Sequence, residues 1–418
     1  MTLTNGALAA TDSAPPNVVL IISDHMGYGD IQPYGAADVK TPALTRLAEQ
    51  GVTMTNFYAA APVCGPSRAA LYTGQYPARL GFERNINPHT AGLSASIPSL
   101  PRWLKEAGYQ TALFGKWHLG SGPDNAPQAH GFDEFFGHHA WTIGYYDHRT
   151  SDGSPGLYSG GLVVERSGYL TDLLTDAAIE FVVRNQNQPF FLTLAYNAGL
   201  PPYQAPGLPE QRWDQGWDAN EASRSDYVQM IERMDHGIGR LLDSLDKTAL
   251  SDNTLVIYLY DHGGRHVVDS GPLFHGFGTL WEGGIRVPAL LRLPNVIPAN
   301  QRFAMPGIAM DLTATIVDVV GRDAVIPTLD GVSLIPYLND EPDSLQRQLF
   351  WRMDSTSFGK QRAIREGSWK YLEHGHTQFL FDLSNDLGER HNLYYRNQAV
   401  ANRLRNKLDA WLRALREL

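Results

Sequence analysis

Short apolar runs alternate with amphipathic stretches along most of the chain. Four of the runs are continuous and rich in β-branched and aromatic residues, which is typical of strands buried on both faces of a parallel sheet. They lie at 18–23, 109–114, 190–196 and 255–260. The stretches 169–184 and 225–245 repeat apolar residues at helical spacing, which predicts long helices with one buried face. This alternation predicts a doubly wound α/β domain.

Proline and glycine residues bound shorter elements in the same region. Pro42 after Thr41 is typical of the first position and the cap of a helix, and Gly74 is typical of a helix end. We expect three short helices and one short strand here. The helices lie at 41–51, 66–73 and 101–107, and the strand lies at 52–57.

The pattern changes after about residue 340. Four strand-like pieces joined by turns are followed by one amphipathic stretch, which predicts a small antiparallel sheet closed by a helix. The pieces lie at 349–352, 361–365, 369–372 and 378–381, and the helix lies at 398–418. We therefore expect a disordered leader over 1–15, an α/β domain over 16–340 and a C-terminal subdomain over 341–418.

Charge and composition argue against several classes of protein. The net charge is -10, with 44 acidic against 34 basic residues, which argues against a nucleic-acid partner. No apolar stretch approaches the ~20 residues of a membrane span, so we expect no membrane partner. The chain start is small and polar and is unlike a signal peptide, and the single cysteine allows no internal disulfide. We expect a cytoplasmic protein; its oligomeric state is not predicted.

Two of the apolar runs end in the same dipeptide. The run at 18–23 leads into Asp24-His25, and the run at 255–260 leads into Asp261-His262. Ligands of open α/β sheets bind beyond the carboxyl ends of the strands, so the two pairs are expected to meet at one site. One such pair alone would more readily cap a loop. Two carboxylates and two imidazoles together suit a divalent metal ion.

The segment Cys64-Gly65-Pro66-Ser67-Arg68 combines reactive and helix-starting residues. Pro66 suits the first turn of a helix, which places Cys64 at the positive helix terminus, where a thiolate is favoured. Arg68 lies one turn further and can point back toward the same place. The alternative is a buried structural cysteine, which the proline and arginine at fixed offsets disfavour.

This segment resembles the maturation motif C-x-P-S-R of the formylglycine-dependent sulfatases, in the alkaline phosphatase superfamily. Further segments match motifs of that family in the same order. They are 16–21, 27–30, 69–74, 115–120, 281–288, 329–334, 367–371 and 381–383. The resemblance implies an alkaline-phosphatase-like, doubly wound and mostly parallel sheet with a small C-terminal antiparallel sheet.

The resemblance also implies a nucleophile and its partners. In the family, a formylglycine-generating enzyme binds the chain transiently and oxidises the cysteine, here Cys64. One hydroxyl of the hydrated aldehyde attacks sulfur, and the other later expels sulfate. A divalent ion, usually calcium, assists. By motif match the ligands would be Asp24 and Asp261, and three further residues would act on the formylglycine and the anion: Arg68, Lys116 and His118 as the proton acceptor.

Four positions depart from the family pattern. His25 and His262 stand where the family has Asp and Asn, and imidazoles favour zinc, manganese or iron over calcium. Leu200 stands at the family's leaving-group histidine and Phe277 at its sulfate-binding lysine. His275 is the expected partial substitute, while three other nearby residues are interpreted as surface or supporting groups: His139, His266 and Tyr145.

These features predict an atypical sulfuric ester hydrolase. An apolar pocket wall suits a small sulfate ester with an aromatic or hydrophobic leaving group, which departs without a general acid. The alternatives are a phosphonate or phosphate monoester hydrolase, a non-hydrolytic redox metalloenzyme on the same scaffold, and a non-catalytic binding protein.

Overall fold

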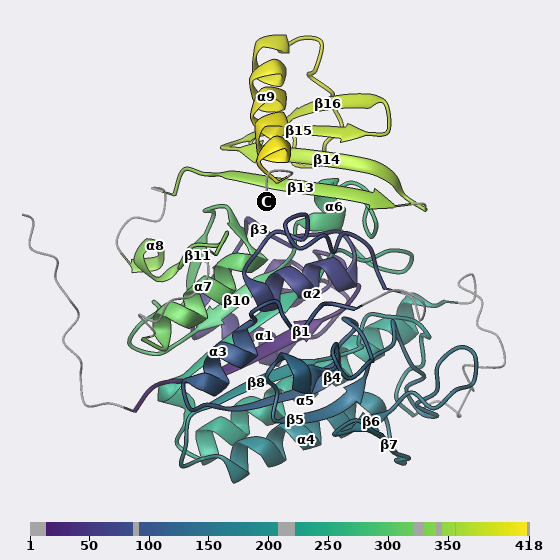
Figure 1. Cartoon of the computed structure of the whole chain (residues 1–418), viewed down its shortest axis with the longest axis vertical. Coiled ribbons are helices and arrows are strands. Elements are labelled where there is room, and N and C mark those ends of the chain that lie inside the picture. Colours follow the sequence, from purple (N-terminus) through teal and green to yellow (C-terminus); the bar gives the residue numbers. More distant parts are fainter. Residues whose placement is uncertain are drawn as a thin grey trace, which may run out of the picture.

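The computed structural model of the chain describes residues 14–86, 92–207, 222–321, 329–339, 345–355 and 357–415. A ten-stranded sheet forms the centre of the molecule, and a separate four-stranded sheet with one helix lies against one end of it (Figure 1). The order of the large sheet is β11-β2-β10-β9-β1-β8-β4-β5-β6-β7. The expected α/β architecture with a small C-terminal antiparallel sheet is confirmed.

Five parallel strands make up the middle of the large sheet. They are β9 (Thr254–Tyr260), β1 (Asn17–Ser23), β8 (Phe190–Ala195), β4 (Gln110–Lys116) and β5 (Glu134–His138). Every residue of β1, β8 and β9 is buried, because helices cover both faces of the sheet. The register pairs Ser23 with Tyr260, so the residues that come after these two strands lie side by side.

Helices pack on both faces of the sheet (Figure 1). On one face lie α1 (Pro42–Glu49), α4 (Leu170–Arg184) and α5 (Arg224–Lys247). On the other face lie α2 (Cys64–Thr73), α3 (Leu100–Glu106) and α7 (Ala309–Val319). The predicted helices in this region are present. Helix α2 begins two residues before the expected start, and Pro66 still falls in its first turn, where the N–H groups have no partner within the helix.

Short strands at the two edges complete the sheet, and most of them have no clear signal in the sequence. One edge holds β10 (Ala289–Arg292), β2 (Val52–Met54) and β11 (Gln301–Phe303), and the other holds β6 (Tyr158–Ser159) and β7 (Leu162–Val163). Strand β10 runs antiparallel to β9, which makes the sheet mixed. The remaining short elements are η1 (Gln32–Tyr34), β3 (Phe57–Tyr58), η2 (Pro127–His130), η5 (Ser251–Asn253), α6 (Glu282–Ile285), β12 (Gly307–Ile308) and α8 (Ile335–Asn339).

The C-terminal sheet is a simple antiparallel meander covered by one helix. Its strands follow chain order: β13 (Gln348–Ser355), β14 (Gly359–Glu366), β15 (Trp369–His374) and β16 (Thr377–Asp382). Helix α9 (Gln398–Ala414) packs across β14 and β15 (Figure 1). Buried apolar side chains from both layers form the small core between them: Ile364, Tyr371, Leu380, Ala401, Leu404 and Leu408.

Buried polar contacts fix this sheet onto the α/β core. Glu282 of the core accepts hydrogen bonds from Lys370 of β15 at 2.9 Å and from Tyr58 at 2.7 Å. The indole of Trp351 in β13 donates to the carbonyl oxygen of Ala59 at 2.9 Å. The C-terminal sheet therefore has a defined position against the core, next to the region where α2 begins.

Some expected boundaries lie outside the described residues. Nearly all of the predicted leader (1–13), the predicted junction at 340–341 and the last three residues of the predicted C-terminal helix are among them. Ala14 and Pro15, which are described, are exposed. Within the described part of the chain, no helix combines the length and the apolar character needed to cross a membrane.

Candidate active site

The two Asp-His dipeptides lie next to each other at the carboxyl edge of the sheet. They come directly after the paired strands β1 and β9, and the backbone N–H of Asp261 donates to the carbonyl oxygen of Ser23 at 3.1 Å. Asp24 and Asp261 are both buried. The pairing of parallel strands thus brings together residues that are far apart in the sequence, as their positions at the two strand ends predict.

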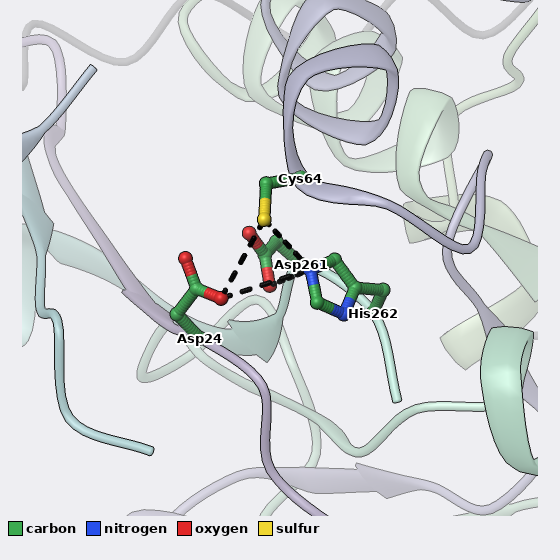
Figure 2. Close-up of side chains that lie close together, drawn as sticks. All are labelled: Asp24, Cys64, Asp261 and His262. Atoms are coloured by element: carbon green, nitrogen blue, oxygen red, sulfur yellow. Dashed lines mark hydrogen bonds and ion pairs between the residues drawn. The ribbon is translucent and has the colours of Figure 1, made fainter. Parts of the chain in front are cut away.

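Cys64 is the first residue of α2 and points into the same place. Its Sγ lies 3.0 Å from Nε2 of His262 and 3.8 Å from Oδ1 of Asp24 (Figure 2). The side chain is fully buried. The backbone N–H of Gly65, in the first turn of this helix, donates to the side-chain oxygen of Asn85 at 2.8 Å. The sequence carries no signal for this capping role of Asn85, because it depends on a contact between separate loops.

Two buried cations hold the carboxylates in place. Arg68 donates from Nη2 to Asp24 Oδ2 and from Nε to Asp261 Oδ2, both at 3.0 Å. Lys116, at the end of β4, donates to the same Asp24 oxygen at 2.6 Å. Arg68 also donates to the carbonyl oxygen of Lys116 at 2.9 Å. Both cations donate to the Oδ2 atoms. The Oδ1 atoms of the two carboxylates lie on the side that faces Cys64 and His262.

The pKa values at the site depend on burial and on these charges. Burial would raise the pKa of Asp24, but the charges of Lys116 and Arg68 hold it far below its usual range. Burial, together with the nearby Asp24 carboxylate, raises the pKa of Asp261. Burial would lower the pKa of His262, but the charges of Asp261 and Cys64 outweigh it and raise the pKa to about 10. The site therefore favours a positive charge at the position of His262 Nε2.

The residues here fit a divalent metal ion. One donor atom from each of Asp24, Cys64, Asp261 and His262 lies within 4.8 Å of all the others. Asp261 Oδ1 is buried and has no hydrogen-bond partner among the residues that the structure describes. Carboxylate oxygens and an imidazole nitrogen that converge in this way are a common donor set for divalent metals. Asp24, Asp261 and His262 could therefore hold such an ion.

His25 lies beside this group but outside the four closely spaced donors. Its ring packs against Phe277, with centroids 4.9 Å apart, and stands perpendicular to the ring of His262 at 5.8 Å. Burial lowers its pKa to about 3, so the ring is neutral. Its φ of 59° is uncommon for a residue other than glycine. Of the four predicted metal ligands, His25 is the one that the structure does not place in the cluster.

His118 lies just after the end of β4 and lines a cleft together with Val63, the residue before Cys64. It is buried, and its Nδ1 has no hydrogen-bond partner among the described residues. Burial and the charges of Lys116 and Arg68 hold its pKa well below the usual range of histidine. The ring is therefore neutral near pH 7 and can accept a proton, the role that the resemblance gives it.

A cleft of about 1000 Å³ opens beside this site, and its wall combines aromatic side chains with charged and polar ones such as Glu83, Arg84 and Asp354. Phe277 lies at its inner end, where its ring contacts His262 at 5.0 Å and Phe358 at 5.5 Å between centroids. The exposed Trp141 also lines it. Leu200 is fully buried, and the neighbouring Gly199 packs so closely on the carbonyl oxygen of Asp24 that a Cβ there would lie 1.9 Å from it. Two of the four positions interpreted as departures from the family pattern thus carry apolar side chains, Phe277 in the cleft and Leu200 next to the glycine that packs on Asp24.

His275 is not part of this arrangement. Its exposed ring packs against Phe274 and Trp281, with centroids 4.1 and 5.2 Å apart. It lines a second cavity, of about 330 Å³, together with His266 and with Phe277 and Phe358, which also line the cleft. His139 packs between Phe135 and Tyr158, and the Tyr145 hydroxyl donates to a backbone carbonyl. None of these described contacts joins His275 to Cys64, and its role as a substitute acid stays a prediction.

Several residues at the site were missed by sequence reasoning. His138 ends β5, pairs in register with Lys116 and is fully buried; its Nε2 lies 2.5 Å from Oδ1 of Asn197. Phe358 lines the cleft. If the strand at 134–138 had been recognisable in the sequence, His138 would have been expected at the carboxyl ends of the strands, next to the site. Phe358 had no such signal, because it reaches the site from the hairpin between β13 and β14.

Comparison with known proteins identifies the family. A protein-family model described as "Sulfatase" matches residues 16–322. This chain belongs to the sulfatase family. A second model, described as "N-sulphoglucosamine sulphohydrolase, C-terminal", matches residues 275–417 of this sulfatase. The chain is therefore a sulfatase-family enzyme of the sulfuric ester hydrolase type, in the alkaline phosphatase superfamily.

Similar proteins cover most of the chain. It is 32% identical to the N-acetylgalactosamine-6-sulfatase of Canis lupus familiaris over 92% of this chain and 83% of that protein. It is 31% identical to the arylsulfatase A of Bos taurus over 93% of this chain and 85% of that one. The crystal structure of Ps i-CgsB superposes with a TM-score of 0.85 at 31% identity, covering 95% and 93% of the two chains. The phosphonate monoester hydrolase of Agrobacterium radiobacter, at 22% identity, shares the fold with a TM-score of 0.70 and covers 96% and 95%.

Proposed function

We propose that this sulfatase hydrolyses aryl or similarly activated sulfate esters through a formylglycine made from Cys64. The observation that carries the proposal is the position of Cys64. It lies buried at the start of α2, in contact with His262 and Asp24, and the preceding residue, Val63, lines the cleft together with His118. Formylglycine and a divalent metal are what membership of the family implies.

The charged residues around Cys64 have distinct roles in this proposal. Arg68 and Lys116 fix Asp24 and supply positive charge beside the nucleophile. A divalent ion held by Asp24, Asp261 and His262 would stabilise the negative charge on a transferred sulfuryl group. The neutral His118 accepts a proton from the formylglycine, because its lowered pKa leaves one ring nitrogen unprotonated near neutrality.

The apolar residues near the site narrow the substrate class. Leu200 and Phe277 can donate neither a proton nor a charge to the departing oxygen or the sulfate. A general acid typically contributes about 10²–10⁴-fold to the rate, so esters of poorly acidic alcohols are poor substrates here. A phenolate can leave without that acid. The rings of phenol esters can also pack against the aromatic side chains of Phe277, Phe358 and Trp141 in the cleft.

A panel of esters tests the proposal. The enzyme, produced together with a formylglycine-generating enzyme, is assayed on aryl sulfates of graded phenol acidity, on an alkyl sulfate, and on aryl phosphate and phosphonate monoesters. We expect aryl sulfates to be hydrolysed fastest, with rates that rise steeply with phenol acidity. In Cys64→Ala the rate should fall by at least about 10³-fold, because the nucleophile is lost. Faster hydrolysis of the phosphonate esters, or full activity in Cys64→Ala, contradicts the proposal.

A further inference from the structure

Each carboxylate of the site keeps one oxygen free of the buried cations. Lys116 and Arg68 occupy the Oδ2 atoms. Asp24 Oδ1 lies 3.8 Å from Cys64 Sγ and 3.6 Å from His262 Nε2, and Asp261 Oδ1 lies 3.4 Å from the same nitrogen (Figure 2). Asp261 Oδ1 is fully buried and has no hydrogen-bond partner among the described residues. Two carboxylate oxygens that the cations do not reach therefore face one small space.

The backbone fixes which nitrogen of His262 faces that space. Its Nδ1 lies 2.9 Å from the carbonyl oxygen of Gly263, to which it donates. Nε2 is thus directed at Cys64 Sγ, 3.0 Å away. A histidine whose Nδ1–H is bonded to a backbone carbonyl and whose Nε2 faces other donors has the arrangement of a metal ligand.

The sulfur atom changes which metal these donors suit. Calcium takes about six to eight oxygen ligands, and only two of the four donors here are oxygens. Zinc is bound in proteins by thiolate sulfur, imidazole nitrogen and carboxylate oxygen, in most cases by four ligands. The four donors, one sulfur, one nitrogen and two oxygens, lie within 4.8 Å of one another. Their chemistry is that of a zinc site for as long as Cys64 keeps its sulfur.

We propose that the thiol form of this chain binds a divalent transition metal, zinc foremost, with Cys64 thiolate as a ligand beside His262, Asp24 and Asp261. The single hydrogen held between Sγ and Nε2 leaves as a proton, and bonds from both atoms to the metal replace it. The metal stays divalent and nothing is oxidised. The proposal concerns the unconverted cysteine and does not rest on formylglycine, which has no sulfur to offer.

Metal binding through sulfur has a consequence for the reactivity of the chain. A thiolate bound to zinc is a weaker nucleophile than a free one, since its electron pair is engaged by the metal. The metal-loaded thiol form therefore reacts slowly with alkylating reagents at Cys64, and removal of the metal restores the reaction. Because Cys64 is the single cysteine of the chain, this rate reports on one site.

Cobalt(II) provides the direct test, because it replaces zinc and is coloured. The full chain is produced without a formylglycine-generating enzyme, and its mass is checked to establish that Cys64 is a thiol. We expect a thiolate-to-cobalt charge-transfer band in the near ultraviolet that saturates at one cobalt per chain. Zinc should remove the band, and calcium should not. Zinc should also slow alkylation of Cys64 by at least about tenfold.

Variants separate the sulfur ligand from the fold. Cys64→Ser should lose the band and weaken zinc binding by at least about tenfold, since even the outer partners of metal ligands are worth about 10- to 100-fold. His262→Asn should also weaken zinc binding, and His391→Asn, which alters an exposed histidine in the C-terminal region, should leave both readouts unchanged. Thermal unfolding establishes that each variant is folded.

Two results would overturn the inference. One is cobalt binding without a charge-transfer band, which would mean that the metal does not contact sulfur. The other is zinc binding that is equally tight in the folded Cys64→Ser variant. Neither result bears on the formylglycine proposal, which is judged separately from the converted enzyme and its activity on sulfate esters.

Discussion

Asp24 is the residue on which the charges of the site converge. Its Oδ2 accepts hydrogen bonds from Lys116 and Arg68, and its Oδ1 lies near Cys64 and His262. This geometry explains why a carboxylate can stay ionised in a fully buried position: two buried cations offset the cost of desolvation. The same cations leave one oxygen of the carboxylate for a metal ion.

Phe277 is the residue whose replacement tests the substrate class. The sequence motifs predict that it replaces a sulfate-binding lysine of the family, and its ring packs against those of His25 and His262. In Phe277→Lys we expect kcat/KM for an alkyl sulfate to rise by about tenfold or more, because a cation placed near developing negative charge stabilises the transition state. The value for aryl sulfates should fall, since the aromatic wall is broken.

The matched control for that substitution is Phe277→Leu, which removes the ring without adding a charge. It should lower the rate on aryl sulfates and leave the rate on alkyl sulfates unchanged. If Phe277→Lys improves alkyl sulfate hydrolysis and leaves aryl sulfate hydrolysis intact, the wall has no part in choosing the substrate. The ratio of kcat/KM values for the two esters is the measurement that decides.

Strand ends explain why part of this site is predictable from sequence. The runs that form β1 and β9 are continuous and apolar, so their ends could be located, and adjacent parallel strands bring together the residues at their carboxyl ends. The position of Cys64 at the start of α2 is predictable in the same way from Pro66 and Arg68. In each case a local pattern determines the element, and the element determines the position of the side chain.

Other parts of the site depend on contacts that no local pattern encodes. Asp24-His25 and Asp261-His262 are the same dipeptide, yet only His262 points its Nε2 at Cys64, while His25 packs on Phe277. Short mixed strands such as β5, which carries His138, and β10 do not stand out in the sequence, because packing rather than propensity decides them. The loop of His275 turns its ring toward Trp281, and its role as a substitute acid stays a prediction.

The whole molecule contributes to the cleft through its C-terminal sheet. Phe358, at the hairpin between β13 and β14, packs against Phe277. Gln361 in β14 accepts a hydrogen bond from the backbone of Leu280 at 2.8 Å and donates to the carbonyl oxygen of Gly278 at 3.1 Å. The hairpin therefore holds the loop that carries Phe277, and the two parts of the chain form one cleft.

A buried acid pair at the same junction makes stability depend on pH. Lys370 lies 2.9 Å from carboxylate oxygens of both Glu282 and Glu389. Burial would raise the pKa of Glu282, but Lys370 and Arg286 lower it to about 2. Burial, together with the charge of Glu282, raises the pKa of Glu389 to about 7 from its ordinary 4.5. Near pH 6 the folded protein thus holds a proton on Glu389 that the unfolded chain releases.

The difference between the pKa of Glu389 in the folded protein and in the unfolded chain sets the sign of the pH effect on the free energy of unfolding. The stabilising contribution of the Glu389 proton is complete below about pH 4.5 and is lost as the pH rises through about 7. In Glu389→Gln, which mimics the protonated acid, this loss is absent. The free energy of unfolding of the wild type should fall relative to that of the variant between about pH 4.5 and 7. Chemical denaturation at several pH values measures it; exposed Glu165→Gln is the control, and parallel pH profiles for wild type and Glu389→Gln would contradict the assignment.

Conversion of Cys64 to the nucleophile of this sulfatase changes the mass of the peptide that spans it. The protein is purified from its own host and digested, and the mass of that peptide is measured by mass spectrometry. If formylglycine forms, we expect the mass of an aldehyde or its hydrate in place of the thiol. An intact thiol in protein that hydrolyses sulfate esters would contradict this conversion, because the nucleophile would then have to lie elsewhere.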